Sequence, residues 1–349
     1  MTGTTKTTSD RPAGAAPAPD GRASRPPAPD GIIIVDKAGG MTSHDVVARV
    51  RRLAGTRRVG HAGTLDPMAT GVLIVGVEKA TRLLGHLSLT HKEYAATIRL
   101  GQSTTTDDAE GEPSGCAPAT GVTRAALDRE IAKLTGEIAQ VPPLVSAIKV
   151  GGQRAYKLTR AGAAPELKPR PVTVYEFTVT DVRQAGDLLD VDATVRCSSG
   201  TYIRALARDL GAALGTGGHL TALRRTSVGP YTIAQARTLD FLAERLEVTP
   251  LPDAAAAAFP RLDLGQDDAR RLSHGIRIQV PESMTAATAA TASVTSTPAA
   301  SASAATPASG AEPSNLISET PLAAFAPDGT LIALVAAELG RLRPLAVFV

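Results

Sequence analysis

Residues 60–73, GHAGTLDPMATGVL, place a single carboxylate, Asp66, among residues that shape the backbone. Pro67 disfavours helical geometry at Asp66, and the glycines at positions 60, 63 and 71 permit turns or a close approach of the backbone. The apolar run that starts at Val72 is typical of a buried strand. We therefore predict a shaped loop that presents an acid ahead of a buried strand. The loop alone is equally compatible with an ordinary surface turn.

The chain on the N-terminal side of this loop predicts a strand and an amphipathic helix. Residues 31–37, GIIIVDK, have the pattern of a buried strand. Residues 42–55 predict a helix that Thr42 or Ser43 caps and Gly55 ends, with valines along one face. The outer face of this helix and the turn after it carry a basic cluster that leads into the loop, formed by Arg49, Arg52, Arg57 and Arg58.

The chain on the C-terminal side of the loop alternates between strand and helix patterns. A regular alternation of apolar and polar residues predicts a strand over 93–101, and a capped amphipathic pattern predicts a helix over 123–136. We expect a pair of strands over 171–183 and 188–198. We also expect a helix over 199–215 that begins directly after the second of these strands.

Two segments of biased composition, residues 1–30 and 283–314, stand apart from the rest of the chain. Residues 1–30 are rich in Ala, Pro, Thr and Gly, and we predict that they are disordered because they have almost no large apolar side chains to bury. Residues 283–314 form a low-complexity segment of Ala, Ser, Thr, Pro and Gly. We expect the flanking stretches, 261–280 and 321–349, to form one small β-rich domain that this segment interrupts, with a hairpin turn at 327–329.

The cysteine content and the absence of common motifs exclude several classes of protein. Cys116 and Cys197 are the only cysteines, so the sequence has neither a zinc ribbon nor a disulfide framework, and it fits a reducing cytoplasm. It shows no secretory signal and no apolar run long enough to span a membrane. It also lacks a P-loop, a GxGxxG fingerprint and an HExxH motif. We therefore expect any enzyme chemistry to need no metal, nucleotide or redox cofactor and to rely on acid–base or carboxylate-nucleophile steps.

Six stretches of the chain, taken in order, resemble the TruB family of RNA pseudouridine synthases. They are VDKAGGMTSHDVV (35–47), GHAGTLDPMATGVL (60–73), KEYAATIRLG (92–101), VPPLVSAIKVGGQRAY (141–156), CSSGTYIRALARDLG (197–211) and GGHLTALRRTSVGPY (217–231). The resemblance implies an α/β (α+β) fold, with helices flanking a mixed, largely antiparallel sheet and a small PUA-like β domain at the C-terminal end. We place the catalytic domain at 31–248 and the PUA-like domain at 249–349.

The same resemblance implies that the chain flips a uridine out of the T loop of tRNA, at position 55, and isomerises it to pseudouridine without a cofactor. Asp66 matches the catalytic aspartate of the family. Its carboxylate could attack the sugar carbon or remove a neighbouring sugar proton to give a glycal, and the sequence leaves both routes open. An RNA-binding or tRNA-folding module with secondary catalysis is the alternative. A glycosidase-like hydrolase is a third hypothesis, which would need a second catalytic carboxylate.

Further residues match the family's active site through their motifs. Arg204, in TYIR, matches the arginine that pairs with the aspartate. Tyr94, in KEY, matches the tyrosine that stacks on the extruded base, and its hydroxyl is suited to removing the C5 proton. The other matches are Tyr202 as a second pocket wall, His61 as the residue that enters the T loop, Lys37 and Leu223 beside the pocket, and Asp108, which would hold the uracil or order Arg204. Ordinary packing is the plain alternative for each of these side chains.

The expected partner is tRNA, bound through its T arm and, at the C-terminal domain, through its acceptor stem. The resemblance favours a monomer. Basic side chains that neutralise phosphates would supply affinity. The candidates are Arg49, Arg52, Arg57 and Arg58 beside the loop, and Lys149, Arg154, Lys157 and Arg160 in the basic, helix-like stretch that follows two prolines at 142–143. A solvated surface position is the alternative for each.

Overall fold

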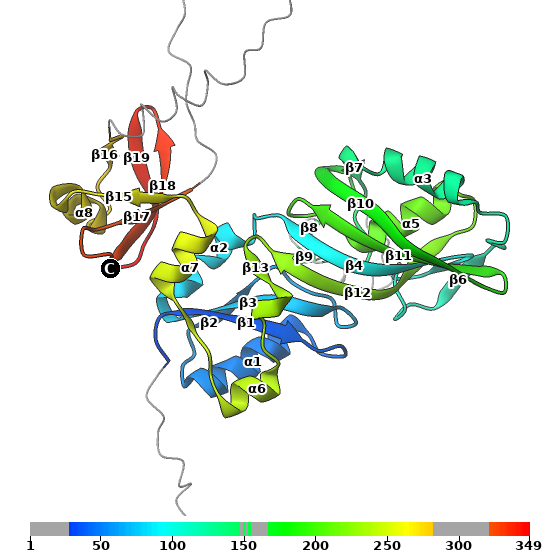
Figure 1. Cartoon of the computed structure of the whole chain (residues 1–349), viewed down its shortest axis with the longest axis horizontal. Coiled ribbons are helices and arrows are strands. Elements are labelled where there is room, and N and C mark those ends of the chain that lie inside the picture. Colours follow the sequence, from blue (N-terminus) through cyan, green and yellow to red (C-terminus); the bar gives the residue numbers. More distant parts are fainter. Residues whose placement is uncertain (1–27, 147–148, 151–152, 155–166, 282–320) are drawn as a thin grey trace, which may run out of the picture.

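The computed structural model describes residues 28–146, 149–150, 153–154, 167–281 and 321–349, and a ten-stranded sheet dominates them (Figure 1). Eight strands follow one another in the order β14 (Thr249–Pro250), β1 (Gly31–Lys37), β3 (Thr70–Val77), β12 (Gly218–Val228), β4 (Lys92–Leu100), β11 (Leu188–Cys197), β10 (Arg170–Ala185) and β7 (Gly136–Gln140). Two shorter strands, β2 (Val59–Ala62) and β13 (Tyr231–Thr232), pair with β3 and β12. The expected mixed, largely antiparallel sheet is confirmed.

A parallel seam joins the two halves of this sheet. β3 and β12 pair over two positions, Thr70 with Arg224 and Gly71 with Arg225, and every other pairing in the sheet is antiparallel. Gly71 has a φ of +98°, and a Cβ atom there would lie 2.2 Å from the carbonyl oxygen of Arg225. Only glycine fits this close approach. The seam therefore depends on the last glycine of the stretch 60–73.

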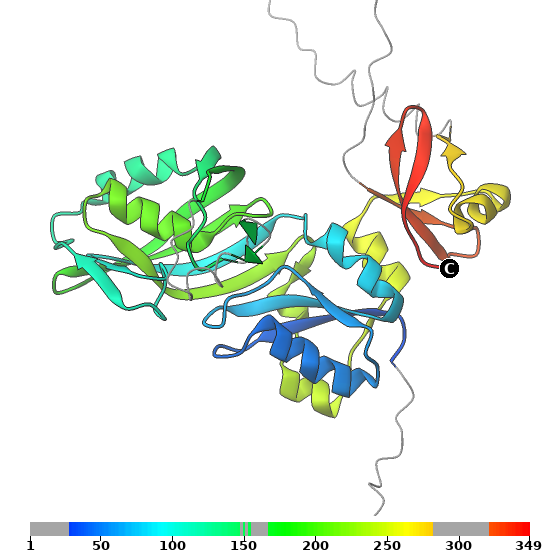
Figure 2. The same cartoon turned by 180° about the vertical axis from the view of Figure 1, so that it is seen from behind.

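Four helices cover the sheet and share one hydrophobic core with it. α1 (Ser43–Ala54) and α6 (Leu239–Glu244) pack on the half that contains β1 and β3, and α3 (Arg124–Lys133) and α5 (Ile203–Ala213) pack on the other half (Figure 2). α1 has the predicted ends: Thr42 accepts a hydrogen bond from the backbone of Asp45, and Gly55 closes the helix in the left-handed conformation.

A second, five-stranded sheet forms the C-terminal part of the molecule. Its order is β15 (Arg261–Asp263), β17 (Leu322–Phe325), β18 (Leu331–Glu338), β19 (Arg341–Val347) and β16 (Ile278–Gln279), with α8 (Gln266–Ser273) beside it. The short segments η1 (Glu78–Arg82), α2 (Leu84–Leu87) and α7 (Leu251–Ala258) lie between the two sheets (Figure 1). Phe325 and Phe348 share a core with Ile32 and Ile74, so the C-terminal sheet packs on the main one. The expected C-terminal β domain with a turn at 327–329 is confirmed.

Three local predictions differ from the structure. The stretch 60–73 is not all loop, because Gly60–Ala62 belong to β2 and Thr70–Leu73 to β3. The last residues of the expected disordered tail are anchored, since the backbone N–H of Ala28 donates to Ala54 and the side chain of Asp30 accepts from the backbone of Lys79. The helix α5 begins at Ile203 rather than directly after β11.

The remaining strands form two small pairs outside the main sheets. β5 (Gln102–Thr104) pairs with β6 (Pro113–Cys116), and β8 (Lys149–Val150) pairs with β9 (Gln153–Arg154). The second pair lies just before the end of the basic stretch for which we expected a helix-like pattern, and residues 155–162 of that stretch lie outside the described residues. A short 3-10 segment, η2 (Ile233–Gln235), follows β13. The rest of the tail (1–27) and the low-complexity segment (283–314) lie outside the described residues.

Candidate active site

The loop 63–69 connects β2 to β3 and leads into the seam that β3 forms with β12. Hydrogen bonds from Ser43 and Lys37 fix its backbone on either side of Asp66. Before it, the hydroxyl of Ser43 accepts a hydrogen bond from the backbone N–H of Leu65 at 3.0 Å and donates one to its carbonyl at 3.2 Å. After it, the ammonium of Lys37 donates to the carbonyl of Pro67 at 3.1 Å. Asp66 is therefore held between two buried polar groups from the first strand and helix.

Arg204 binds the carboxylate of Asp66 with two hydrogen bonds. Its Nε lies 2.9 Å from Oδ2 and its Nη2 lies 3.2 Å from Oδ1. Arg204 is 4% exposed, whereas 36% of the Asp66 side chain remains open to solvent. A two-point contact between a guanidinium and a carboxylate is strong and directional. The pair thus presents a charged, oriented carboxylate at the surface of a cavity.

Further groups fix Arg204 itself. Its guanidinium donates to the backbone carbonyls of Thr106 at 2.8 Å and Val145 at 2.9 Å. The buried carboxylate of Asp108 lies 3.5 Å from its Nε. Asp108 in turn accepts hydrogen bonds from the hydroxyl of Thr106 and from the backbone of Glu110. The loop after β5 therefore orients the arginine that orients Asp66.

The cavity beside Asp66 has a volume of about 290 Å³. Tyr94 of β4, Tyr202 just before α5 and Leu223 of β12 line it together with Asp66 and Arg204. Burial raises the pKa of both tyrosine hydroxyls, so both are neutral phenols near pH 7. Apolar ring faces around one open carboxylate suit a flat, polar ring such as a nucleobase.

The segment between β11 and α5 is irregular because it helps to form this cavity. Ser199, Gly200 and Thr201 line the cavity before the helix begins. The side-chain amide of Gln140 donates to the carbonyl of Tyr202 at 3.1 Å and accepts from its backbone N–H at 2.8 Å. Tyr202 is the N-cap residue of α5 and has extended backbone, with φ −103° and ψ 112°, and its carbonyl also accepts from the N–H of Leu206. Gln140 satisfies the N–H of Tyr202, which has no acceptor within the helix, and so stabilises a start of the helix that the sequence pattern placed too early.

The structure brings most of the expected site residues together. Asp66, Arg204, Tyr94, Tyr202 and Leu223 line one cavity, and Asp108 and Lys37 act on it through Arg204 and Pro67. Lys37 is fully buried and also donates to two further backbone carbonyls, and burial lowers its pKa.

His61 does not line this cavity. It sits on β2, where its ring meets the ring of His44 edge to face at 5.6 Å. Its Nδ1 is buried and has no hydrogen-bond partner among the residues that the structure describes. Burial, with smaller contributions from His44 and Arg225, lowers the pKa of His61. The residue is therefore a neutral imidazole near pH 7, beside the loop that carries Asp66.

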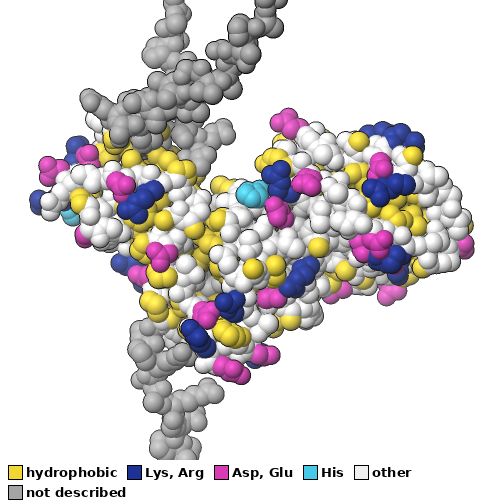
Figure 3. Space-filling view, in the orientation of Figure 1, with side chains coloured by type: hydrophobic (Ala, Val, Ile, Leu, Met, Phe, Trp, Pro, Cys, Tyr) yellow, Lys and Arg dark blue, Asp and Glu magenta, His cyan; other side chains and the backbone are white. Residues whose placement is uncertain are grey.

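The basic residues chosen for RNA binding fall into three groups. Arg49 and Arg58 form ion pairs, with Asp240 at 3.0 Å and Glu78 at 3.7 Å. Arg52 and Arg57 are exposed. The backbones of Lys149 and Arg154 pair in β8 and β9, and Lys157 and Arg160 lie outside the described residues. Basic side chains are interspersed with acidic ones over the face in Figure 3 rather than gathered into one field.

Two cavity residues were missed by the sequence analysis. Lys92 of β4 and Arg225 of β12 line the same cavity and are 6% and 1% exposed. Both lie inside stretches that resemble the family, two residues before Tyr94 and two after Leu223. Alternation along a strand places residues two apart on the same face, so this spacing was the available signal.

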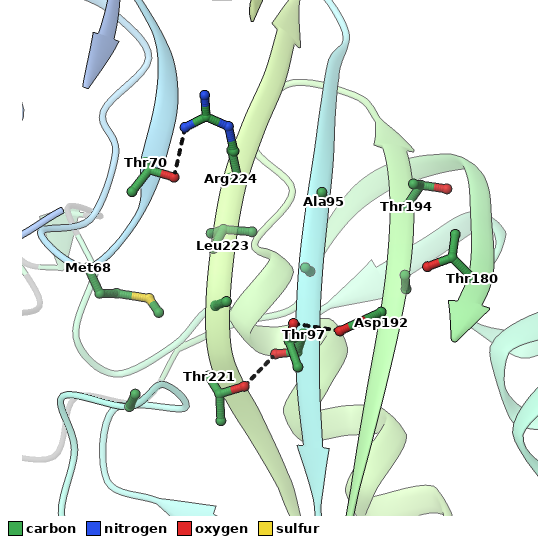
Figure 4. Close-up of a pocket in the computed structure, with 14 residues that line it drawn as sticks. Met68, Thr70, Ala95, Thr97, Thr180, Asp192, Thr194, Thr221, Leu223 and Arg224 are labelled. Atoms are coloured by element: carbon green, nitrogen blue, oxygen red, sulfur yellow. Dashed lines mark hydrogen bonds between the residues drawn. The ribbon is translucent and has the colours of Figure 1, made fainter. Parts of the chain in front are cut away.

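A larger hollow of about 610 Å³ lies along β4, β11 and β12 (Figure 4). Thr97, Thr221 and Arg224 line it, and Leu223 belongs to the lining of both this hollow and the cavity beside Asp66. Met68 and Thr70 reach it from the end of the loop that carries Asp66 and from the start of β3. Its described lining does not include Asp66, Arg204 or either of the two tyrosines.

The described residues contain no group of three or more His, Cys, Asp and Glu side chains placed to hold a metal ion. None of the described helices is long and apolar enough to cross a membrane.

Comparison with known families agrees with the geometry. Residues 51–203 match the model of the TruB family pseudouridylate synthase N-terminal domain, residues 204–253 a tRNA pseudouridylate synthase B C-terminal domain, and residues 318–349 a tRNA pseudouridine synthase II C-terminal domain. The tRNA pseudouridine synthase B of Thermobifida fusca is 57% identical over 91% of this chain and 98% of its own length. The protein of the same name from Streptomyces coelicolor is 54% identical over 92% and 97%.

Solved structures show the same fold at lower identity. The structure of an H/ACA RNP bound to a substrate RNA containing 2′-deoxyuridine matches with a TM-score of 0.62 and 23% identity, over 91% of this chain and 85% of the other. A Cbf5–Nop10–Gar1 complex matches equally, with a TM-score of 0.62 and 24% identity, over 91% and 85%. From its close relatives and its three family matches, this chain belongs to the TruB family of pseudouridine synthases.

Proposed function

We propose that the protein isomerises uridine to pseudouridine in the T loop of tRNA, at position 55. One observation carries this proposal: an open carboxylate, Asp66, is held by a buried arginine at the edge of a cavity lined by two tyrosines. The names of its close relatives supply the RNA class, tRNA. The choice of the T-loop uridine rests on the motifs in the sequence.

The chemistry assigns a task to each group. The uridine leaves the RNA stack and enters the cavity, where Tyr94 offers a ring face for stacking worth about 1–3 kcal/mol. Asp66 acts at the sugar, either as a nucleophile at C1′ or as a base toward the C2′ proton, while Arg204 fixes its orientation. The detached uracil rotates and rejoins C1′ through C5. The C5 proton then leaves, and the Tyr94 hydroxyl is the group assigned to this step.

The remaining parts of the chain are assigned to RNA binding. We propose a catalytic domain over 31–248 and a PUA-like domain over 249–349, which contacts the acceptor stem while Arg52 and Arg57 approach phosphates of the T arm. The protein is proposed to act as a monomer in the cytoplasm. An RNA-folding module is the second candidate, because the same surfaces would bind tRNA whether or not Asp66 reacts.

Nucleoside analysis of a T-arm stem-loop separates these candidates. The purified full chain is incubated with the RNA, which is then digested to nucleosides and separated by chromatography. We expect one pseudouridine per RNA, and none when the target uridine is replaced by cytidine. Release of free uracil would instead indicate a hydrolase. Binding without any change in the nucleosides would support the folding module.

A further inference from the structure

Two buried cations lie side by side at the floor of the catalytic cavity, and we call them the cation pair. They are Arg225, which is 1% exposed, and Lys92, which is 6% exposed. Their side chains meet at Gly63, where an added Cβ atom would lie 3.4 Å from Nη1 of Arg225 and 3.7 Å from Cε of Lys92. Both line the cavity together with Tyr94.

The hydrogen-bond partners of the cation pair are neutral. Arg225 donates to the carbonyls of Val72 at 2.7 Å and Gly63 at 2.9 Å. Lys92 donates to the carbonyls of Ser88 at 2.7 Å and Thr90 at 2.6 Å. Neither cation forms an ion pair with a carboxylate within the described part of the chain. Buried charges are normally paired, because desolvation of an isolated charge is costly.

Among the described residues, the other charges of the site leave this positive charge without a counter-ion. Asp66 and Asp108 face Arg204 rather than the cation pair. An arrangement that keeps two buried cations beside an open cavity suits a site where negative charge appears during the reaction, because donors that are already oriented need no reorganisation at that moment. The cavity is about 290 Å³, and its lining includes Tyr94 and Leu223, which suits a flat base.

We propose that Arg225 and Lys92 stabilise the negative charge that develops on uracil when it detaches from the sugar. This inference rests on the proposed function. When the C1′–N1 bond breaks, its electron pair leaves with the base, and the charge spreads over N1 and the two carbonyl oxygens of uracil. C1′ becomes bonded to Asp66, or the sugar loses its C2′ proton to Asp66. The C5 carbon of the anion then supplies the pair for the new C1′–C5 bond: on the first route it displaces the Asp66 carboxylate from C1′, and on the second C2′ takes its proton back from Asp66 as C5 adds to C1′. The C5 proton departs and N1 gains a proton, so the product is an isomer.

The surroundings of Lys92 are consistent with a cation that needs an incoming anion. Burial, with a smaller contribution from Arg225, lowers the pKa of Lys92 to about 8. The groups that face it are Arg225 from β12, Cys197 from β11 and Tyr94 on its own strand. The pKa of the Cys197 thiol is raised to about 11, so it is neutral near pH 7. Without substrate, Lys92 therefore loses its proton as the pH rises through about 8, and the rate should fall over the same range.

The test compares two substrates in the same protein preparation. The RNAs are T-arm stem-loops with uridine or 5-fluorouridine at the target position. The fluorine withdraws electrons, so the detached base is a weaker base and needs less stabilisation. Loss of the starting nucleoside is followed by chromatography under single-turnover conditions for wild type, Lys92→Met and Lys92→Arg. The ratio of the two rates is independent of the fraction of active protein, so partial misfolding of a variant does not affect it.

We expect Lys92→Met to slow the uridine reaction roughly 100-fold and the 5-fluorouridine reaction much less. Lys92→Arg, which keeps the charge, should retain a ratio close to that of wild type and lose the fall in rate above pH 8. Lys79→Met, at an exposed lysine, is the matched control and should change neither rate. Equal slowing of both substrates by Lys92→Met, or no slowing, would overturn the inference. A wild-type protein that leaves both substrates unchanged would overturn the proposed function itself.

Discussion

Arg204 connects the loop that carries Asp66 with two other segments of the chain. Its carbonyl partners, Thr106 and Val145, are 98 and 59 residues away in sequence. The pairing of Arg204 with Asp66 could be anticipated from motifs that resemble a known family. The two carbonyl contacts could not, because backbone acceptors carry no signature in the sequence and tertiary folding alone brings them together.

Replacing Arg204 by lysine should separate chemistry from binding. A lysine keeps the charge but cannot hold both carboxylate oxygens of Asp66 and two carbonyls at once. We expect the single-turnover rate to fall roughly 100-fold with saturating RNA, while RNA affinity is unchanged. Arg208→Lys, one turn along α5 at a residue that pairs with Asp107 and Asp209, is the matched control and should lose far less. An unchanged rate in Arg204→Lys would show that the two-point contact from Arg204 to Asp66 is not needed for the reaction.

Tyr94→Phe should affect a different step. Phenylalanine keeps the ring face that stacks on the base but removes the hydroxyl assigned to the C5 proton. We expect uridine to be consumed faster than tritium is released from an RNA labelled at C5, because the rearranged base waits for proton loss. Both quantities can be followed in one reaction. Tritium release at the wild-type rate would show that the hydroxyl has no part in this step.

At the scale of elements, β3 and β12 matter most, because their short parallel seam adjoins the loop that carries Asp66. The sequence indicated β3 and the capped helix α1, since their apolar periods and end residues are local signals, but no strand was predicted over the residues of β12. It did not indicate where α5 begins. That boundary depends on Gln140, whose side chain holds the backbone of Tyr202 from 62 residues away. Local patterns predicted elements here, and distant contacts set their ends.

Gly71→Ala should break the seam. The added methyl group would lie 2.2 Å from the carbonyl of Arg225 and would hold a positive φ of +98°. We expect a loss of about 3 kcal/mol or more in the free energy of unfolding, which lowers Tm by roughly 5–10 °C, together with loss of activity. Gly85→Ala, in α2, is the control, because its Cβ atom would meet nothing within 4 Å. It should leave Tm unchanged or slightly raised. Equal Tm values for the two variants would contradict the role given to the seam.

At the scale of the whole molecule, one hydrophobic core joins the C-terminal sheet to the main sheet through α2 and α7. The sequence predicted the C-terminal β domain and its interrupted form. It did not predict this shared core, because the apolar pattern of a strand shows that one face is buried but not which other element packs on it. The N-terminal boundary was also placed slightly late, since the hydrogen bonds of Ala28 and Asp30 belong to the folded part.

Two truncations test that boundary. Removing residues 1–27 should leave Tm and activity unchanged, because their composition offers little surface to bury. Removing residues 1–30 also deletes the bonds that Ala28 makes to Ala54 and that Asp30 makes to Lys79 and Leu251. We expect this second truncation to cost about 2 kcal/mol, measured as a lower Tm. If the shorter truncation already lowers Tm by the same amount, the stabilising contacts lie before residue 28.

Tritium release from a T-arm stem-loop labelled at uridine C5 tests the central assignment most directly. It is measured in a single turnover, without added metal or nucleotide, for wild type, Asp66→Asn and the exposed control Asp128→Asn, with RNA binding measured in parallel. Release by wild type and Asp128→Asn but none by Asp66→Asn, with RNA bound by all three, is the predicted result. Release by Asp66→Asn at the wild-type rate would show that the carboxylate held by Arg204 is not the group that acts on uridine.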